Sequence, residues 1–122
     1  MVKLNTRRIG DVVIIDVVGK IVLGSGADDS LEAMRKLATD GEKKAILNLV
    51  DTVFVDAAGI GVLVSGYTSI KDINGRLKLL APRQQLRKKL HITKLDTVFE
   101  IYEDEAAAVD SFKEGDGTCP SN

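Results

Sequence analysis

Two short apolar runs constrain the fold of this chain more than any other feature of its sequence. Residues 12–18 are β-branched and aliphatic except for Asp16, and residues 45–50 are apolar except for Asn48. Runs of this length with almost no polar alternation are typical of strands that are covered on both faces. The first run predicts a central strand of a sheet, and helices must then supply the covering layers.

The remaining segments alternate between strand and helix signals. Residues 2–9 and 12–18 flank Gly10 and Asp11, which predicts an antiparallel hairpin with its turn at that pair. A first helix is expected after the capping residues Asp28, Asp29 and Ser30, with its end at residues 39–41. Periodicity also predicts a loop at residues 19–26, strands at residues 45–50, 77–80 and 97–102, and helices at residues 58–73, 83–91 and 104–113.

The order of these segments predicts the fold class. Strand-helix-strand units imply right-handed crossovers and parallel pairing, whereas the opening hairpin adds an antiparallel edge. We therefore expect a single α/β domain over residues 1–113, with a mixed, mostly parallel sheet and packed helices. Residues 114–122 are small and polar, and a disordered tail is expected there.

The composition excludes several classes of protein. A chain of 122 residues with 44% hydrophobic and 29% charged residues is typical of one soluble globular domain. Its formal net charge of -1 predicts no direct binding to nucleic acid and no attraction to an anionic membrane. No apolar stretch reaches the roughly 18 residues of a membrane span, and no secretory signal opens the chain, so a cytoplasmic location is expected.

The sequence offers few residues for metal or redox chemistry. Cys119 is the only cysteine and His91 the only histidine, so neither has a partner of its own kind. No disulfide, metal site or cofactor is therefore expected. A set of nucleophile, base and orienting group is also missing from the sequence pattern, which predicts that the chain is not an enzyme.

Residues 53–61 join a buried strand to an amphipathic helix through an acidic turn. Asp56 precedes the helix, where a carboxylate can accept hydrogen bonds from free backbone N–H groups. Gly59 and Gly61 leave room for another backbone or a ligand to approach. By itself, the turn is more typical of a plain capped helix. The apolar stripe of this helix is expected to consist of Ile60, Leu63, Val64, Tyr67 and Ile70.

This arrangement resembles the STAS domain of bacterial anti-sigma factor antagonists. The resemblance rests on the order of elements, on Gly19 after the second strand, and on residues 47–49 leading into residues 54–61. Residues 74–79 and 95–100 also resemble recurrent segments of these proteins. The resemblance covers about residues 8–113, which is nearly the whole expected domain.

The resemblance implies a protein that binds an anti-sigma factor, usually a serine kinase of the histidine-kinase-like ATPase fold. Such binding frees a sigma factor and so regulates transcription. A monomer or weak dimer is expected. The implied partner-binding residues lie at the start of the central helix: Asp56, Ala57, Ala58, Gly59, Ile60, Val62 and Ser65.

One position departs from the family pattern. The residue after the motif aspartate is commonly a serine or threonine that the partner kinase phosphorylates, but here it is Ala57, followed by Ala58. Without a hydroxyl, the chain should behave as though permanently unphosphorylated, whether these alanines are natural or introduced. Regulation could instead use another hydroxyl: Thr52, Ser65 or Ser25.

Three features leave alternatives open. The glycine-lined turn could hold an anion, so a STAS-fold ligand or nucleotide sensor is the alternative function. The acidic loop at residues 23–30 is either a second contact segment or a mobile loop with a helix cap. Arg83, Arg87, Lys88, Lys89 and Lys94 form a basic cluster, which is expected to be a solvated face because no aromatic residues are interleaved.

Overall fold

The structure is a computed structural model that describes residues 2–115. Its chain alternates strands and helices in the expected order, with one strand more than the sequence predicts. The strands are β1 (Lys3–Ile9), β2 (Val12–Ile21), β3 (Lys44–Asn48), β4 (Thr52–Val55), β5 (Arg76–Leu80) and β6 (Ile101–Tyr102). The helices are α1 (Ala27–Thr39), α2 (Ala57–Lys71), α3 (Gln84–Ile92), the short 3-10 helix η1 (Leu95–Thr97) and α4 (Glu105–Gly115).

The six strands form a mixed sheet in the order β1-β2-β3-β5-β6, and β4 pairs with the end of β2. β1 and β2 are antiparallel, with Ile9 opposite Val12, so the predicted hairpin turn at Gly10 and Asp11 is confirmed. All other pairs are parallel. The predicted class, one α/β domain with a mixed, mostly parallel sheet, is confirmed.

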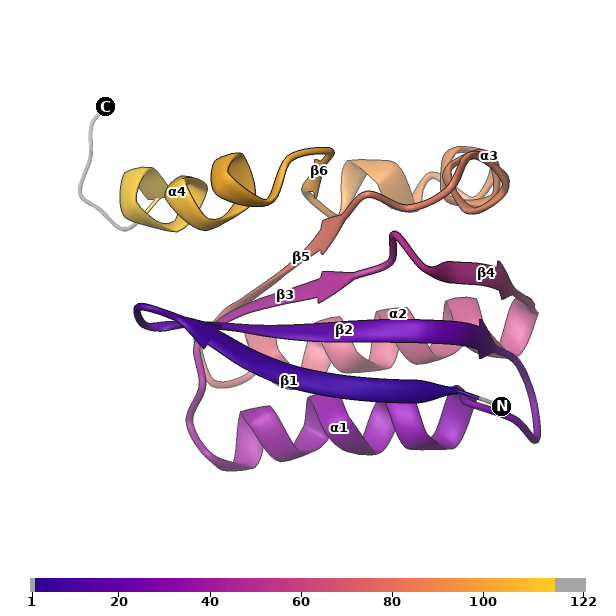
Figure 1. The fold of residues 1–122 in the computed structure, drawn as a ribbon, viewed down its shortest axis with the longest axis horizontal. Coiled ribbons are helices and arrows are strands. Elements are labelled where there is room, and N and C mark those ends of the chain that lie inside the picture. Colours follow the sequence, from indigo (N-terminus) through magenta and orange to yellow (C-terminus); the bar gives the residue numbers. More distant parts are fainter. Residues whose placement is uncertain (1, 116–122) are drawn as a thin grey trace.

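Helices cover both faces of the sheet, which explains the two nearly unbroken apolar runs. α1 and α2 lie against one face and α4 against the other (Figure 1). Along β2, Val13 and Ile15 enter the core beneath α1 and α2, whereas Val12 and Ile14 enter the smaller core beneath α4. Successive side chains of a strand point to opposite faces, so a strand covered twice must be apolar at every position.

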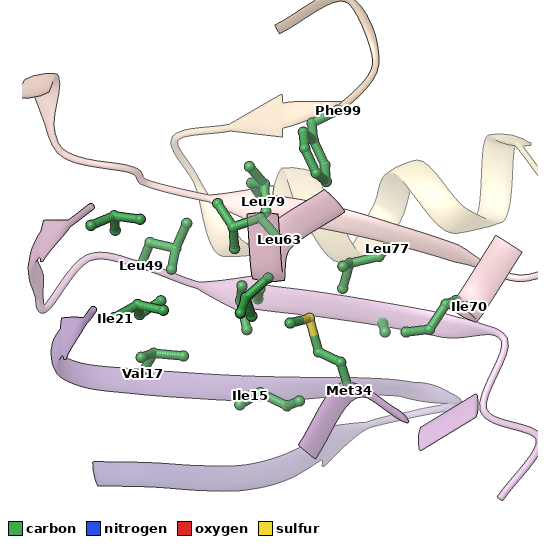
Figure 2. Close-up of a cluster of buried hydrophobic side chains, with 14 of the residues drawn as sticks. Ile15, Val17, Ile21, Met34, Leu49, Leu63, Ile70, Leu77, Leu79 and Phe99 are labelled. Atoms are coloured by element: carbon green, nitrogen blue, oxygen red, sulfur yellow. The ribbon is translucent and has the colours of Figure 1, made fainter. Parts of the chain in front are cut away.

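The larger core is built around α2. Leu63 and Ile70 are fully buried, and Met34 of α1 reaches toward them across the sheet face (Figure 2). The sulfur of Met34 lies where Gly66 leaves space, because a Cβ atom at Gly66 would overlap it. The two helices therefore pack closely at a position where only glycine fits without rearrangement.

Two predictions near β2 were wrong for one reason. Residues 19–21 were expected in a loop, but β2 continues to Ile21, and Thr52–Val55 forms the unpredicted strand β4 beside it. The register shifts between Gly19 and Lys20, and Gly19 has a φ of 117°, which is the left-handed region that favours glycine. Pairing across this bulge stabilises both short segments. The sequence of either segment alone does not predict this pairing.

The last strand is shorter than predicted. Strand geometry was expected over residues 97–102, but only Ile101–Tyr102 pairs with β5, after the 3-10 helix Leu95–Thr97. The turn brings Phe99 into the core, where its ring meets the edge of Tyr67 at a centroid distance of 5.1 Å. Burial of this aromatic ring thus replaces a longer strand pairing.

The predicted stripe of α2 was also partly wrong. Leu63 and Ile70 are buried as expected, and the half-buried Ile60 and Tyr67 pack against the same core, but Val64 is 37% exposed. The buried face consists of Gly59, Val62, Leu63, Gly66 and Ile70. Two glycines face the core, so a pattern read from large apolar residues misplaces the face by part of a turn.

The helix ends differ slightly from expectation. α1 begins at Ala27 with Gly26 as its N-cap, so Asp28 and Asp29 lie in its first turn and no side chain caps it. α2 was expected to end at residue 73, before Asn74 and Gly75, but it ends two residues earlier, at Lys71. Asn74 adopts the left-handed conformation with a φ of 65°. α4 extends to Gly115; the rest of the expected tail lies outside the described residues.

Candidate functional site at the start of α2

Asp56 fixes the geometry of the turn that enters α2. Its Oδ1 accepts a hydrogen bond from Gly59 N–H at 2.8 Å, and its Oδ2 accepts one from Leu23 N–H at 3.0 Å. The first bond caps the helix, and the second joins the helix start to the loop that follows β2. One carboxylate thus connects two segments that are far apart in the sequence.

The same hydrogen bonds determine the charge state of Asp56. Backbone N–H donation from Leu23 and then from Gly59 stabilises the carboxylate and holds its pKa below the ordinary value. The contribution of these bonds to stability is complete above the unfolded-state pKa of about 4 and is lost as the pH falls through the lower folded-state pKa. Asp56 is therefore a negative charge at neutral pH.

Only some of the predicted contact residues are accessible. Ala57 is exposed, and Asp56, Ala58 and Ile60 are half-buried at the surface of the turn. Gly59 is buried against the backbone of β2, because a Cβ atom there would overlap the carbonyl oxygen of Ile21. The close backbone approach predicted for Gly59 is thus made within the domain.

Two further predicted residues, Val62 and Ser65, lie further along the helix. Val62 is 8% exposed and belongs to the core beneath α2, so little of its side chain is accessible to a partner. Ser65 is half-buried further along the helix.

Among the alternative hydroxyls, Thr52 is buried and donates to Val17 O at 2.8 Å, so a kinase could not reach it without local opening.

The structure adds exposed apolar residues that the sequence pattern did not assign to the site. Leu23 is 78% exposed and lies beside the helix start through its hydrogen bond to Asp56. Val53 and Phe54 of β4 are 44% and 42% exposed. They lie on the unpredicted strand β4, which pairs only with β2 at the end of the sheet. The run of apolar residues directly before Asp56 was the sequence feature that could have indicated apolar residues at the site.

Helix α3 lies beside the same turn. Lys89 Nζ donates to Val55 O at 2.5 Å, and Arg83 Nε donates to Val50 O at 3.1 Å. Figure 1 shows α3, β4, the start of α2 and the loop after β2 at one end of the molecule. Arg83 and Lys89 were predicted to belong to a solvated basic face. Both instead donate hydrogen bonds to the segment that leads into the site.

Loss of the Asp56 carboxylate should loosen the turn. We expect Asp56→Ala to lower the melting temperature by about 5 °C, because the cap and the loop contact disappear together. Hydrogen exchange should become faster at the Leu23 and Gly59 amides. Asp56→Asn is the matched control, since its side-chain oxygen can still cap a helix. Equal melting temperatures for the wild type and Asp56→Ala would contradict this role.

Neither a metal cluster nor a membrane span is found in the part of the chain that the structure describes. Within residues 2–115, no three His, Cys, Asp or Glu side chains are grouped so that they could hold a metal ion. No helix among these residues combines the length and apolar character needed to cross a bilayer.

Comparison with known proteins identifies the class. Residues 3–108 match the STAS domain, so the chain belongs to the STAS domain family. Two relatives, both provisionally named anti-sigma factor antagonists, come from Thermotoga neapolitana and Thermotoga maritima. The first is 30% identical over 70 residues, or 57% of this chain and 62% of that protein. The second is 29% identical over 73 residues, or 60% and 65%. The match thus spans less than two thirds of either relative.

Solved structures share the fold. A protein of Thermotoga maritima, provisionally named an anti-sigma factor antagonist, has a TM-score of 0.84 and 22% identity, over 91% of this chain and 95% of that one. An anti-sigma factor antagonist from Mycobacterium paratuberculosis has a TM-score of 0.83 and 18% identity, over 93% and 96%. Unphosphorylated SpoIIAA, also an anti-sigma factor antagonist, has a TM-score of 0.70 and 18% identity, over 91% and 98%.

Proposed function

We propose that this chain is an anti-sigma factor antagonist that binds its anti-sigma factor through the start of α2. The observation that carries the proposal is the exposed Ala57 beside Asp56, whose carboxylate is held by two backbone N–H groups. A rigid, accessible helix start of this kind suits recognition by another protein, because little conformational freedom is lost on binding. The names of the relatives support the same role.

The proposed partner is a serine kinase of the histidine-kinase-like ATPase fold, and its capture by this chain releases a sigma factor in the cytoplasm. SpoIIAA, which shares the fold, has been solved in unphosphorylated and phosphorylated forms, which supports phosphorylation as the switch among such proteins. Ala57 occupies the proposed switch position and has no hydroxyl. The chain would therefore bind its partner constitutively.

The contact surface proposed here is smaller than the set expected from sequence. It consists of Asp56, Ala57, Ala58 and Ile60, with Leu23 added from the neighbouring loop. Gly59 acts through the backbone geometry of the turn, and Ser65 remains a proposed contact at the edge of the surface.

Displacement of a sigma factor tests the proposed function. The chain is used to capture its partner from lysate of the source cells, and the retained anti-sigma factor is identified by mass spectrometry and purified. Adding the chain to the purified complex of sigma and anti-sigma factor should then release free sigma factor, detected by size-exclusion chromatography. Capture without any anti-sigma factor, or binding without release, would contradict the proposal.

Restoring a hydroxyl should restore phosphorylation. We expect Ala57→Ser to accept one phosphate from the cognate kinase with ATP, because the serine would stand exposed at the helix start, where the dipole favours an anion. Intact-mass analysis measures the added group. The wild-type chain is the control and should stay unmodified. An Ala57→Ser chain that stays unmodified with an active kinase would contradict the assignment of the switch position.

A further inference from the structure

Two consecutive apolar side chains stand exposed directly before the candidate site. Val53 is 44% and Phe54 is 42% exposed, although both belong to strand β4. Their neighbours Thr52 and Val55 are buried, so the strand itself is firmly seated and presents these two side chains outward. Exposed aromatic side chains on a rigid frame are typical of residues that anchor a protein interface.

Lys89 of α3 lies over the exposed phenylalanine. Its Nζ is 4.2 Å from the centre of the Phe54 ring and donates to Val55 O at 2.5 Å. Both contacts fix the ammonium group beside β4, with one face on the ring and one N–H on a carbonyl. An ammonium group has three N–H donors, and a carbonyl occupies only one of them here.

Lys89 lies in a basic stretch of the sequence. Residues 73–95 contain seven Lys and Arg residues and no Asp or Glu, although the whole chain has a net charge of -1. Arg87 pairs with Glu103 and His91 with Asp96, both from the following segment. Lys89 has no ion-pair partner among residues 2–115. A fixed cation beside exposed apolar groups is complementary to a carboxylate flanked by apolar side chains.

We propose that Phe54 and Lys89 form a second part of the partner-binding surface, which receives an acidic segment of the anti-sigma factor. An aspartate or glutamate of that segment pairs with Lys89, and an adjacent apolar side chain packs on Phe54. This inference rests on the proposed function, because the patch adjoins Asp56 through Val55 and continues the surface at the start of α2. It adds the chemistry of the partner: acidic and apolar residues side by side.

Selection from a random peptide library displayed on phage tests the patch without the partner. Selection on the full chain should enrich peptides in which Asp or Glu stands next to aromatic or aliphatic residues. One enriched peptide is then titrated against four chains: the wild type, Phe54→Ala, Lys89→Met and Lys88→Met. Lys88 is the matched control, because it is exposed on the same helix and lines a hollow together with His91 and Ile101.

The variants separate the two contributions. We expect Phe54→Ala to weaken binding about tenfold at every NaCl concentration. Lys89→Met should weaken binding about tenfold and also reduce the dependence of affinity on NaCl, since the charge pair is gone. Lys88→Met should leave affinity unchanged. A structural effect alone would lower affinity in Lys89→Met but would keep the NaCl dependence of the wild type.

Three results would overturn the inference. The selection could enrich no acidic motif, or the enriched peptide could bind Lys89→Met as tightly as it binds the wild type. In the third, a short DNA duplex of random sequence would displace the peptide from the chain. The proposed function fails separately, through capture experiments that retain no anti-sigma factor. A peptide that behaves as expected would then still establish an acidic-peptide site at Phe54 and Lys89.

Discussion

A single methyl group added at Gly59 should strongly destabilise this protein. We expect Gly59→Ala to lower the free energy of unfolding by about 3 kcal/mol. The added Cβ would overlap the carbonyl oxygen of Ile21 and lie 2.6 Å from Cγ1 of Val55. Both atoms belong to the paired strands β2 and β4, so neither can move without disturbing the turn at Asp56. Urea denaturation of the two chains measures the difference.

Gly61 provides the matched control within the same helix turn. It is exposed, and a Cβ atom built there meets no atom within 4 Å. Gly61→Ala should therefore raise the free energy of unfolding by about 0.5 to 1 kcal/mol. Alanine has a higher helix propensity than glycine and lowers the conformational entropy of the unfolded chain. Similar stabilities for the two alanine variants would show that the close contact between α2 and β2 is absent.

A negative charge at Ala57 should remove partner binding while leaving the fold intact. We expect Ala57→Asp to weaken the affinity for the anti-sigma factor roughly 100-fold, because a second carboxylate beside Asp56 would be desolvated against the partner. The side chain is exposed, and an acidic residue in the first helical turn interacts favourably with the dipole. The melting temperature should accordingly stay the same or rise slightly. Isothermal titration with the purified anti-sigma factor measures the change.

Ala57→Asn separates charge from size. Asparagine has the shape of aspartate without its charge, so the loss of affinity should be less than about tenfold if charge is the cause. Equal losses in the two variants would assign the effect to steric fit. An unchanged affinity of Ala57→Asp, with a normal melting curve, would place the partner elsewhere on the domain.

The sequence predicted the parts of this fold that depend on local pattern. The apolar runs in β2 and β3 identified strands covered on both faces, since burial on two sides removes polar alternation. Gly10 and Asp11 predicted the hairpin, and Asp56 was correctly expected to cap α2. In each case one short stretch contains the whole signal.

The parts that the sequence did not predict depend on contacts between distant segments. β4 exists because it pairs with β2 beyond the bulge at Gly19, and neither strand carries a signal for that pairing. Gly59 and Gly66 face the core, but glycine has no side chain from which a buried face could be recognised. The exposure of Phe54 likewise follows from the position of β4 at the end of the sheet.

Hydrogen exchange of the chain, alone and in complex with its purified anti-sigma factor, tests the central claim most directly. We expect slower exchange in the complex at the start of α2, at residues 56–60, and in the loop at residues 22–26. The hairpin of β1 and β2 around Gly10 should exchange at the same rate in both samples. Protection confined to that hairpin or to α4, with unchanged exchange at residues 56–60, would contradict the claim that the start of α2 binds the partner.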